Sequence, residues 1–205
     1  LHNDFTSNDV ISTAGTGSFN VIGLKADLVN SATGTVLATM DHTVSSDVIN
    51  VTNNALTGTL TISNGTFVDG DTLNIAGAGT VNVTGLVADV NASTQTGELN
   101  VVSVDDVSIT TGSNNVQVTS NVSGKTAAVN ADQMLDGKTL ITLGSGNLTI
   151  TNLTANLTNT ATGTNTVTLR DDAPGVGVVD TTINSSTAIT VNNGSFDYND
   201  LINLA

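Results

Sequence analysis

Gly15–Leu28 reads GTGSFNVIGLKADL, and its pattern returns as GAGTVNVTGLVADV at Gly77–Val90 and as GSGNLTITNLTANL at Gly144–Leu157. Each copy has a G-x-G, then an alternating apolar run, then L-x-A-D/N before another apolar residue. Self-similarity at a long, nearly fixed period is the signature of a repeat protein. A Thr-Gly pair follows each copy, at Thr33-Gly34, Thr96-Gly97 and Thr162-Gly163.

The repeats divide the chain into units 15–76, 77–143 and 144–205, of 62, 67 and 62 residues. Residues 1–14 resemble the tail of a preceding unit, because SNDVISTA precedes Gly15 much as GDTLNIA precedes Gly77. We therefore expect one continuous body that is a segment of a longer array, in which each repeat contacts its neighbours.

The composition favours strands and turns over helices. Thr, Asn, Val, Ser and Gly dominate, aromatic residues make up 2%, and one Glu stands against seventeen Asp. Good helix formers are scarce, β-branched residues are abundant, and Asn, Asp and Gly supply turns.

The charge balance limits the classes of partner. The net charge is −14, with Lys25, Lys125, Lys138 and Arg170 as the only basic side chains. Nucleic acids and anionic membranes require clustered Lys and Arg, so we expect no nucleic-acid partner. No apolar run is long enough for membrane insertion, and the absence of Cys excludes disulfides and thiolate metal sites.

Period-two alternation in the signature predicts strands with one buried face. We expect Leu and Ala of L-x-A and the following apolar residue to point inward in each copy. The residues between them should point outward: Lys25 and Asp27, Val87 and Asp89, Thr154 and Asn156. Similar short runs recur about every ten residues between turns, as in an all-β solenoid, barrel or sandwich.

A right-handed parallel β-solenoid (β-helix) is the predicted fold, with tandem small β-sandwiches as the alternative. The unit is short for a sandwich domain of about 100 residues, and the core lacks large aromatic side chains. With about twenty residues in each rung, a unit would make about three rungs and the chain about ten.

The signature, the ITTGS at Ile109–Ser113 and the D-G-x-T-L before a G-x-G together resemble the tandem repeats of giant bacterial surface proteins. These belong to the broad group of RTX-like adhesins and surface-layer proteins. The resemblance implies secretion, a structural or adhesive role and often calcium.

The resemblance does not include the RTX calcium nonapeptide, which needs paired glycines and Asp. The nearest fragments begin at Asn8, Gly70, Asp136 and Asn199, none has Gly-Gly-x-Gly, and Lys138 brings a positive charge to one of them.

Acidic residues in expected turns are the candidate metal ligands, with calcium as the candidate cofactor. The alternative is that each Asp accepts hydrogen bonds from backbone N–H groups within its turn. The candidates are Asp41, Asp69, Asp71, Asp105, Asp106, Asp171, Asp172, Asp197 and Asp200.

We expect no catalytic residues. The Asp positions recur with the repeat rather than marking one site, and His2 and His42 have no recognisable Ser or Cys partner. The G-x-G precedes a strand and lacks a following Lys, so it predicts a tight turn and not a phosphate loop.

These features favour a structural segment of a secreted bacterial surface layer, adhesin stalk or extracellular filament. It would lie outside the cell or at its surface and associate head to tail with copies of itself or with flanking repeats of its own chain. One alternative is an adhesive module for glycan or ice, although Thr151, Thr154 and Thr158 form no strict Thr-x-Thr ladder. A polysaccharide-degrading enzyme is a further alternative.

Overall fold

The computed structural model describes residues 9–41, 47–170, 180–195 and 200–205. All regular structure in these residues is β-strand, and no helix occurs among them. The all-β prediction is therefore confirmed for the described part of the chain.

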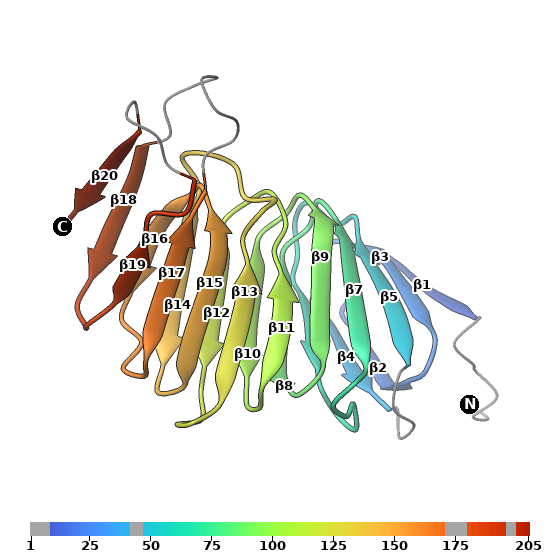
Figure 1. Ribbon diagram of the computed structural model, residues 1–205. Coiled ribbons are helices and arrows are strands. Elements are labelled where there is room, and N and C mark those ends of the chain that lie inside the picture. The colour runs from blue at the N-terminus through green and yellow to red at the C-terminus, as the bar shows by residue number, and fades with distance from the viewer. Residues whose placement is uncertain (1–8, 42–46, 171–179, 196–199) are drawn as a thin grey trace.

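The strands are distributed alternately between two parallel sheets of ten strands each (Figure 1). Sheet A contains β1 Val10–Gly15, β3 Asp27–Ala32, β5 Val48–Asn53, β7 Thr72–Gly77, β9 Asp89–Gln95, β11 Val107–Thr110, β13 Thr126–Asn130, β15 Asn147–Leu153, β17 Asn165–Leu169 and β19 Thr190–Asn192. Sheet B contains β2 Phe19–Leu24, β4 Val36–Met40, β6 Leu60–Ser63, β8 Val81–Leu86, β10 Leu99–Ser103, β12 Val116–Ser120, β14 Thr139–Gly144, β16 Asn156–Asn159, β18 Asp180–Ser185 and β20 Leu201–Leu204.

Each strand pairs in parallel with the strand two positions along the chain, so one strand from each sheet makes one rung of a coil. This confirms the parallel β-solenoid and excludes tandem sandwiches, whose sheets are antiparallel. At roughly 4.8 Å between neighbouring strands, ten stacked rungs form a body about 45 Å long.

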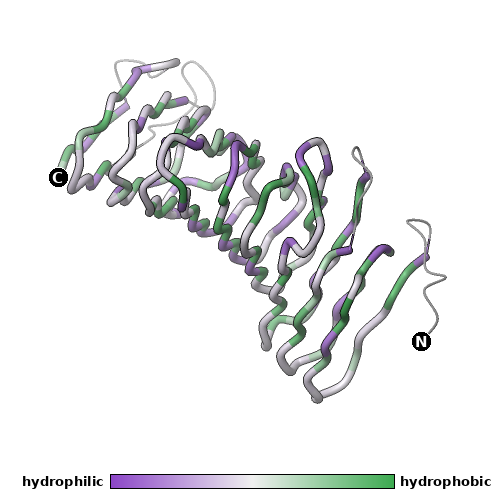
Figure 2. Tube along the Cα trace, turned by 90° about the horizontal axis from the view of Figure 1, so that it is seen from below, coloured by the Kyte–Doolittle hydropathy of each residue, from purple (hydrophilic) through white to green (hydrophobic). Residues whose placement is uncertain are grey.

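A single apolar core runs between the two sheets from β2 to β18. Hydrophobic and hydrophilic residues alternate along the strands (Figure 2), and the inward set consists mainly of Leu, Ile, Val and Ala. Phe67 is the one aromatic side chain in this core. Small aliphatic side chains suit the narrow space between two sheets about 10 Å apart.

The three sequence repeats contain different numbers of strands. The first unit covers β2–β7 and the third covers β15–β20, whereas the second covers seven strands, β8–β14. The second unit fits its extra strand because several of its turns are short. Three rungs per unit, as expected, therefore holds for the first and third units only.

This odd strand number moves the third copy of the signature to the opposite sheet. The alternating run of the signature forms β2 and β8 in sheet B, but β15 in sheet A. The same sequence pattern thus serves either sheet, so the structural unit is one strand with its turn rather than a whole rung.

Candidate functional site

The glycines of the signature stack the turns against each other. Gly15, Gly77 and Gly144 have φ of 100°, 107° and 99°, a conformation that favours glycine. A Cβ on Gly77 would lie 2.2 Å from the carbonyl oxygen of Asn53, and one on Gly144 would lie 2.1 Å from that of Ser120. The tight turn expected from G-x-G is confirmed.

The Thr-Gly pair forms the matching turn of the next rung. The Thr33, Thr96 and Thr162 amides donate to the carbonyl oxygens of Gly15, Gly77 and Gly144 at 2.8–2.9 Å. A Cβ on the glycine of each pair would lie 2.1–2.3 Å from the carbonyl oxygen of the second glycine of the G-x-G. Close backbone packing between turns therefore explains the glycines of the second and third G-x-G and of the three Thr-Gly pairs. A Cβ on Gly15 or Gly17, in the first rung, would meet none of the described atoms within 4 Å.

The L-x-A-D/N segment places its apolar side chains inside, as predicted, in all three copies. One expectation about its outer residues was wrong: Thr154 is buried, with 2% of its surface exposed. Its hydroxyl donates to the carbonyl oxygen of Met134 at 2.9 Å. This hydrogen bond satisfies the hydroxyl without water, which is why a polar residue is tolerated there.

The Asp or Asn of this segment has the same role in every copy. Its Oδ1 accepts a hydrogen bond from the backbone N–H of a residue one rung further along. The Asn50 amide donates to Asp27 at 2.8 Å, the Ser108 amide to Asp89 at 2.7 Å and the Thr182 amide to Asn156 at 2.9 Å. Because Asn accepts this bond as Asp does, the position needs an acceptor oxygen and not a negative charge.

A second recurrent feature was missed by the sequence analysis. Gly23, Gly85 and Asn152 occupy the same place in the three copies, with φ of 70°, 67° and 58°. The strand register shifts at each of them, as in a β-bulge. The signal was available in the sequence, since Asn is the commonest substitute for glycine at positive φ.

The predicted metal ligands do not form one group. Asp71 is buried and accepts the backbone N–H of Asp47 at 3.0 Å and of Val68 at 2.9 Å. Asp69 is exposed in the same turn. Asp41, after β4, lies 3.5 Å from the Lys25 ammonium and accepts the Thr66 hydroxyl at 3.2 Å.

Asp105 and Asp106 bracket the ammonium of Lys125, which is 3.3 Å from Asp106 and also contacts Asp105. The hydrogen bond from Lys125, followed by that from the Asp106 amide, lowers the pKa of Asp105 below its ordinary value of 3.8. The same carboxylates raise the pKa of Lys125. Asp106 also accepts the Thr126 amide at 2.7 Å.

Asp200 directly precedes β20. The candidates Asp171, Asp172 and Asp197 lie outside the described residues, as do His2 and His42. In the described ranges, no three Asp, Glu or His side chains gather closely enough to hold a metal ion.

Buried columns of polar side chains run along the inside of the turns. Thr13 donates to Asn30 at 2.7 Å, Asn30 donates to Asn53 at 2.8 Å, and Asn53 donates to the Thr80 carbonyl oxygen at 2.8 Å. A matching column on sheet B lies beside the third copy of the signature, where Thr142 of β14 donates to Asn159 of β16 at 2.7 Å. Asn159 then donates to Ser185 and Thr187, both at 2.9 Å.

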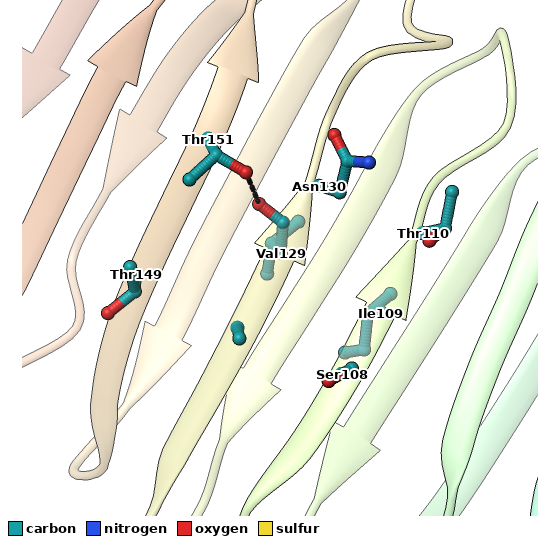
Figure 3. Close-up of a pocket in the computed structure, with 8 residues that line it drawn as sticks. Ser108, Ile109, Thr110, Val129, Asn130, Thr149 and Thr151 are labelled. Carbon is teal, nitrogen blue, oxygen red and sulfur yellow. Dashed lines mark hydrogen bonds between the residues drawn. The ribbon is translucent and has the colours of Figure 1, made fainter.

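Two shallow hollows lie on the outer faces of the sheets. The hollow on sheet A, of about 160 Å³, lies over β11, β13 and β15 and is lined by Ser108, Thr110, Asn130, Thr149 and Thr151, among others (Figure 3). The hollow on sheet B, of about 410 Å³, lies over β10, β12 and β14 and includes Asn100, Gln117 and Ile141. Neither has the converging ionisable groups that catalysis needs.

In the part of the chain that the structure describes, charged residues lie in the turns and at the starts of strands. Within the twenty strands the only charged residues are Asp27, Asp89 and Asp180, each the first residue of its strand. The solenoid therefore presents two broad uncharged faces between acidic edges.

No protein-family model, curated protein or solved structure matches this chain. The part of the chain that the structure describes contains no long apolar helix of the kind that crosses a bilayer.

Proposed function

We propose that this chain is a structural segment of a secreted bacterial surface protein, in a surface layer, an adhesin stalk or an extracellular filament. It spans distance as a stiff rod and stacks end to end on further repeats, of its own chain or of another copy. The cell-surface location rests on the resemblance of its repeats to those of large adhesins and surface-layer proteins.

The observation that carries the proposal is the state of the two terminal rungs. Ile11, Phe19 and Val21 at one end, and Val191 and Ile202 at the other, pack on the core but are only partly buried. Among the described strands, β1 and β2 have a neighbour on one side only, and the same is true of β19 and β20. Unpaired strand edges and open core pair readily with further strands.

An end-on contact of this kind joins two different surfaces, so it extends into a filament rather than closing as a dimer. The acidic turns lie along the edges of the rod, where they keep neighbouring rods soluble. A calcium ion at the turns would reduce this charge, and calcium remains a proposed cofactor.

An end-face variant tests end-on stacking. We expect the chain to sediment as a concentration-dependent series of oligomers, and Ile202→Asp to shift it toward the shortest species. The control is Thr149→Asp, which adds the same charge to an exposed position in the middle of sheet A. Identical sedimentation of the two variants would refute end-on stacking, provided that circular dichroism shows both to be folded.

The proposal assigns no catalytic role. The adjacent carboxylates Asp105 and Asp106 are both engaged by Lys125 or by backbone amides. This arrangement supports a turn-forming role over a pair of acid and base for polysaccharide cleavage.

An adhesive face for ice or glycan is a second candidate, favoured by one row of hydroxyls. Thr149, Thr166 and Thr190 are aligned by register on the outer face of β15, β17 and β19. Thr151, Thr168 and Asn192 lie two residues further along the same strands. With strands roughly 4.8 Å apart, this gives a regular array of hydrogen-bonding groups.

Growth of ice crystals in the presence of the protein tests this candidate. Thr166→Leu should abolish any inhibition of ice recrystallisation, whereas Thr158→Leu on sheet B should not. Absence of inhibition by the unmodified chain, together with failure to bind insoluble polysaccharides, would eliminate the adhesive alternative.

A further inference from the structure

The outer face of sheet B differs from that of sheet A in where its exposed apolar side chains lie. Ile22 in β2 is 77% exposed and Leu37 in β4 is 39% exposed. Ile141 and Leu143 in β14, and Val102 in β10, are partly exposed on the same face. Large exposed aliphatic residues on strands that carry no charge mark an interaction surface.

These residues fall into two rows that follow the register of sheet B. One row contains Asn20, Leu37, Thr61, Asn82, Asn100, Gln117 and Ile141. The other row contains Ile22, Thr39, Ser63, Thr84, Val102, Thr119 and Leu143. The β-bulge at Gly85 lies between Thr84 and Val102 in this row. Apolar residues lie at β2–β4 and again at β14, and of the residues between them only Val102 in β10 is apolar.

We propose that the outer face of sheet B binds the same face of a second copy of this chain, around a two-fold axis that runs parallel to the strands at β8. Such an axis keeps each row facing itself and reverses the order of the rungs. It therefore places β2 opposite β14 and β4 opposite β12 of the other copy.

The side chains match in this arrangement. Ile22 meets Leu143 in one row, and this contact occurs twice because the interface is isologous. Leu37 meets the hollow of about 410 Å³ that Asn100, Gln117 and Ile141 help to line. The outer face of sheet A offers no such pattern. Its exposed Val10 and Val48 lie near one end only, in β1 and β5, and its middle strands present Ser108, Thr110, Ala128, Asn130 and Thr149.

Area and charge both permit the pairing. Seven strands, each of about five residues, cover a face of roughly 34 by 17 Å, so the two copies bury roughly 1,100–1,200 Å² in total. This exceeds the approximately 1,000 Å² that a specific interface requires. Strands β2, β4, β6, β8, β10, β12 and β14 carry no charged residue, and the one carboxylate at the contact is Glu98, which precedes β10 and lines the hollow on sheet B. The two-fold axis places β10 opposite β6, so the Glu98 side chains of two copies of net charge −14 do not face each other.

This pairing is independent of end-on stacking, because it uses the sides of the solenoid and not its ends. A variant that blocks the ends, such as Ile202→Asp, should therefore leave the lateral dimer intact. An experiment can therefore disprove the lateral dimer without disproving end-on stacking, and the reverse.

Sedimentation of matched variants in the Ile202→Asp background tests the interface. We expect a monomer–dimer equilibrium that Ile22→Asp weakens at least tenfold. Leu56→Asp is the control, because it also replaces an exposed aliphatic side chain with a carboxylate. Leu56 is 80% exposed and lies in the turn before β6, outside the two rows. A chain that remains monomeric at high concentration, or equal dimerisation of both variants, would overturn the proposal.

Cysteine cross-linking tests the geometry, since the chain has no Cys of its own. In one copy positions 22 and 143 are six rungs apart, about 29 Å, and cannot form a disulfide. The Ile22→Cys and Leu143→Cys variants should cross-link when mixed and form far less of either homodimer. Homodimers as abundant as the mixed dimer would refute the two-fold axis at β8.

Discussion

Sheet A carries one row of asparagines on its inside and another on its outside, and the hydrogen bonds in the two rows are almost equal in length. Inside, Asn30 donates to Asn53 at 2.8 Å, and both side chains are completely buried. Outside, Asn74 donates to Asn50 at 2.9 Å in contact with solvent. Asn50 and Asn53 belong to the same strand, β5.

The difference lies in what replaces a lost hydrogen bond. Water takes the place of a missing partner on the outer face, so each outer bond contributes little net free energy. Asn30 and Asn53 of the inner row have no exposed surface, and an amide left there without a partner keeps its full desolvation cost. Hydrogen bonds of almost equal length should therefore contribute unequally to the free energy of unfolding, more in the inner row than in the outer row. The following substitutions test this contrast.

Asn53→Ala should have the largest effect. It removes the acceptor of the Asn30 amide and of the Ala55 N–H, and the donor to the Thr80 carbonyl oxygen. With several buried groups left unsatisfied, we expect the free energy of unfolding to fall by about 3 kcal/mol. Equilibrium unfolding in urea measures it, and a loss below about 1 kcal/mol would show that the inner row is not structurally important.

Asn159→Ala should have the next largest effect, about 2 kcal/mol, because it breaks the equivalent column on sheet B. Asn159 accepts from Thr142 and donates to Ser185 and Thr187, the latter two in or just after β18, close to the end of the coil. The same urea measurement applies. A negligible loss, alongside a large one for Asn53→Ala, would mean that the two sheets are not energetically equivalent.

Asn74→Ala should change the free energy of unfolding by no more than about 0.5 kcal/mol, as expected for an exposed position. The substitution removes the outer bond to Asn50 but leaves the β7 backbone pairing in place. If thermal and urea unfolding instead showed a loss as large as that of Asn53→Ala, the contrast between the two rows would be wrong.

Lys125→Met removes an exposed ion pair with Asp105 and Asp106 and should shift the melting temperature only slightly.

This ion pair should also make stability depend on pH. Because the pKa of Asp105 is lowered by folding, its contribution to stability is present above pH 3.8 and is lost as the pH falls through the pKa of the folded state. The raised pKa of Lys125 acts in the opposite range, since its contribution is lost as the pH rises beyond 10.5. Melting curves of both proteins should therefore differ near neutral pH and converge at the two extremes.

Removal of calcium with EGTA should produce the smallest effect. The described candidates Asp41, Asp71, Asp105 and Asp106 have protein partners for their carboxylates. We expect only a small fall in melting temperature when EGTA replaces millimolar calcium, from the loss of weakly held calcium that reduces the repulsion between acidic turns. A marked fall in EGTA would instead support a calcium site, with Asp171, Asp172 and Asp197 as the first residues to substitute.

The sequence could predict the local features because the chemistry of each lies within a few residues. Gly77 and Gly144 identified tight turns, and the spacing of Leu86, Ala88 and Val90 identified a buried face. The same reasoning failed at Thr154, whose partner Met134 is twenty residues away in the chain. Alternation alone cannot show that a hydroxyl will find a carbonyl oxygen in the neighbouring rung.

The all-β class, the repeat and the inward set of side chains could all be predicted before folding was considered, because they follow from strand periodicity and from the conformations that glycine allows. Which rungs lie next to each other became known only from the folded chain. Folding gave seven strands to the second unit, moved the third signature to sheet A and aligned Asn30 with Asn53. The physical reason is that stacking joins residues separated by a whole rung, and the length of that rung depends on how each turn packs against the turn before it.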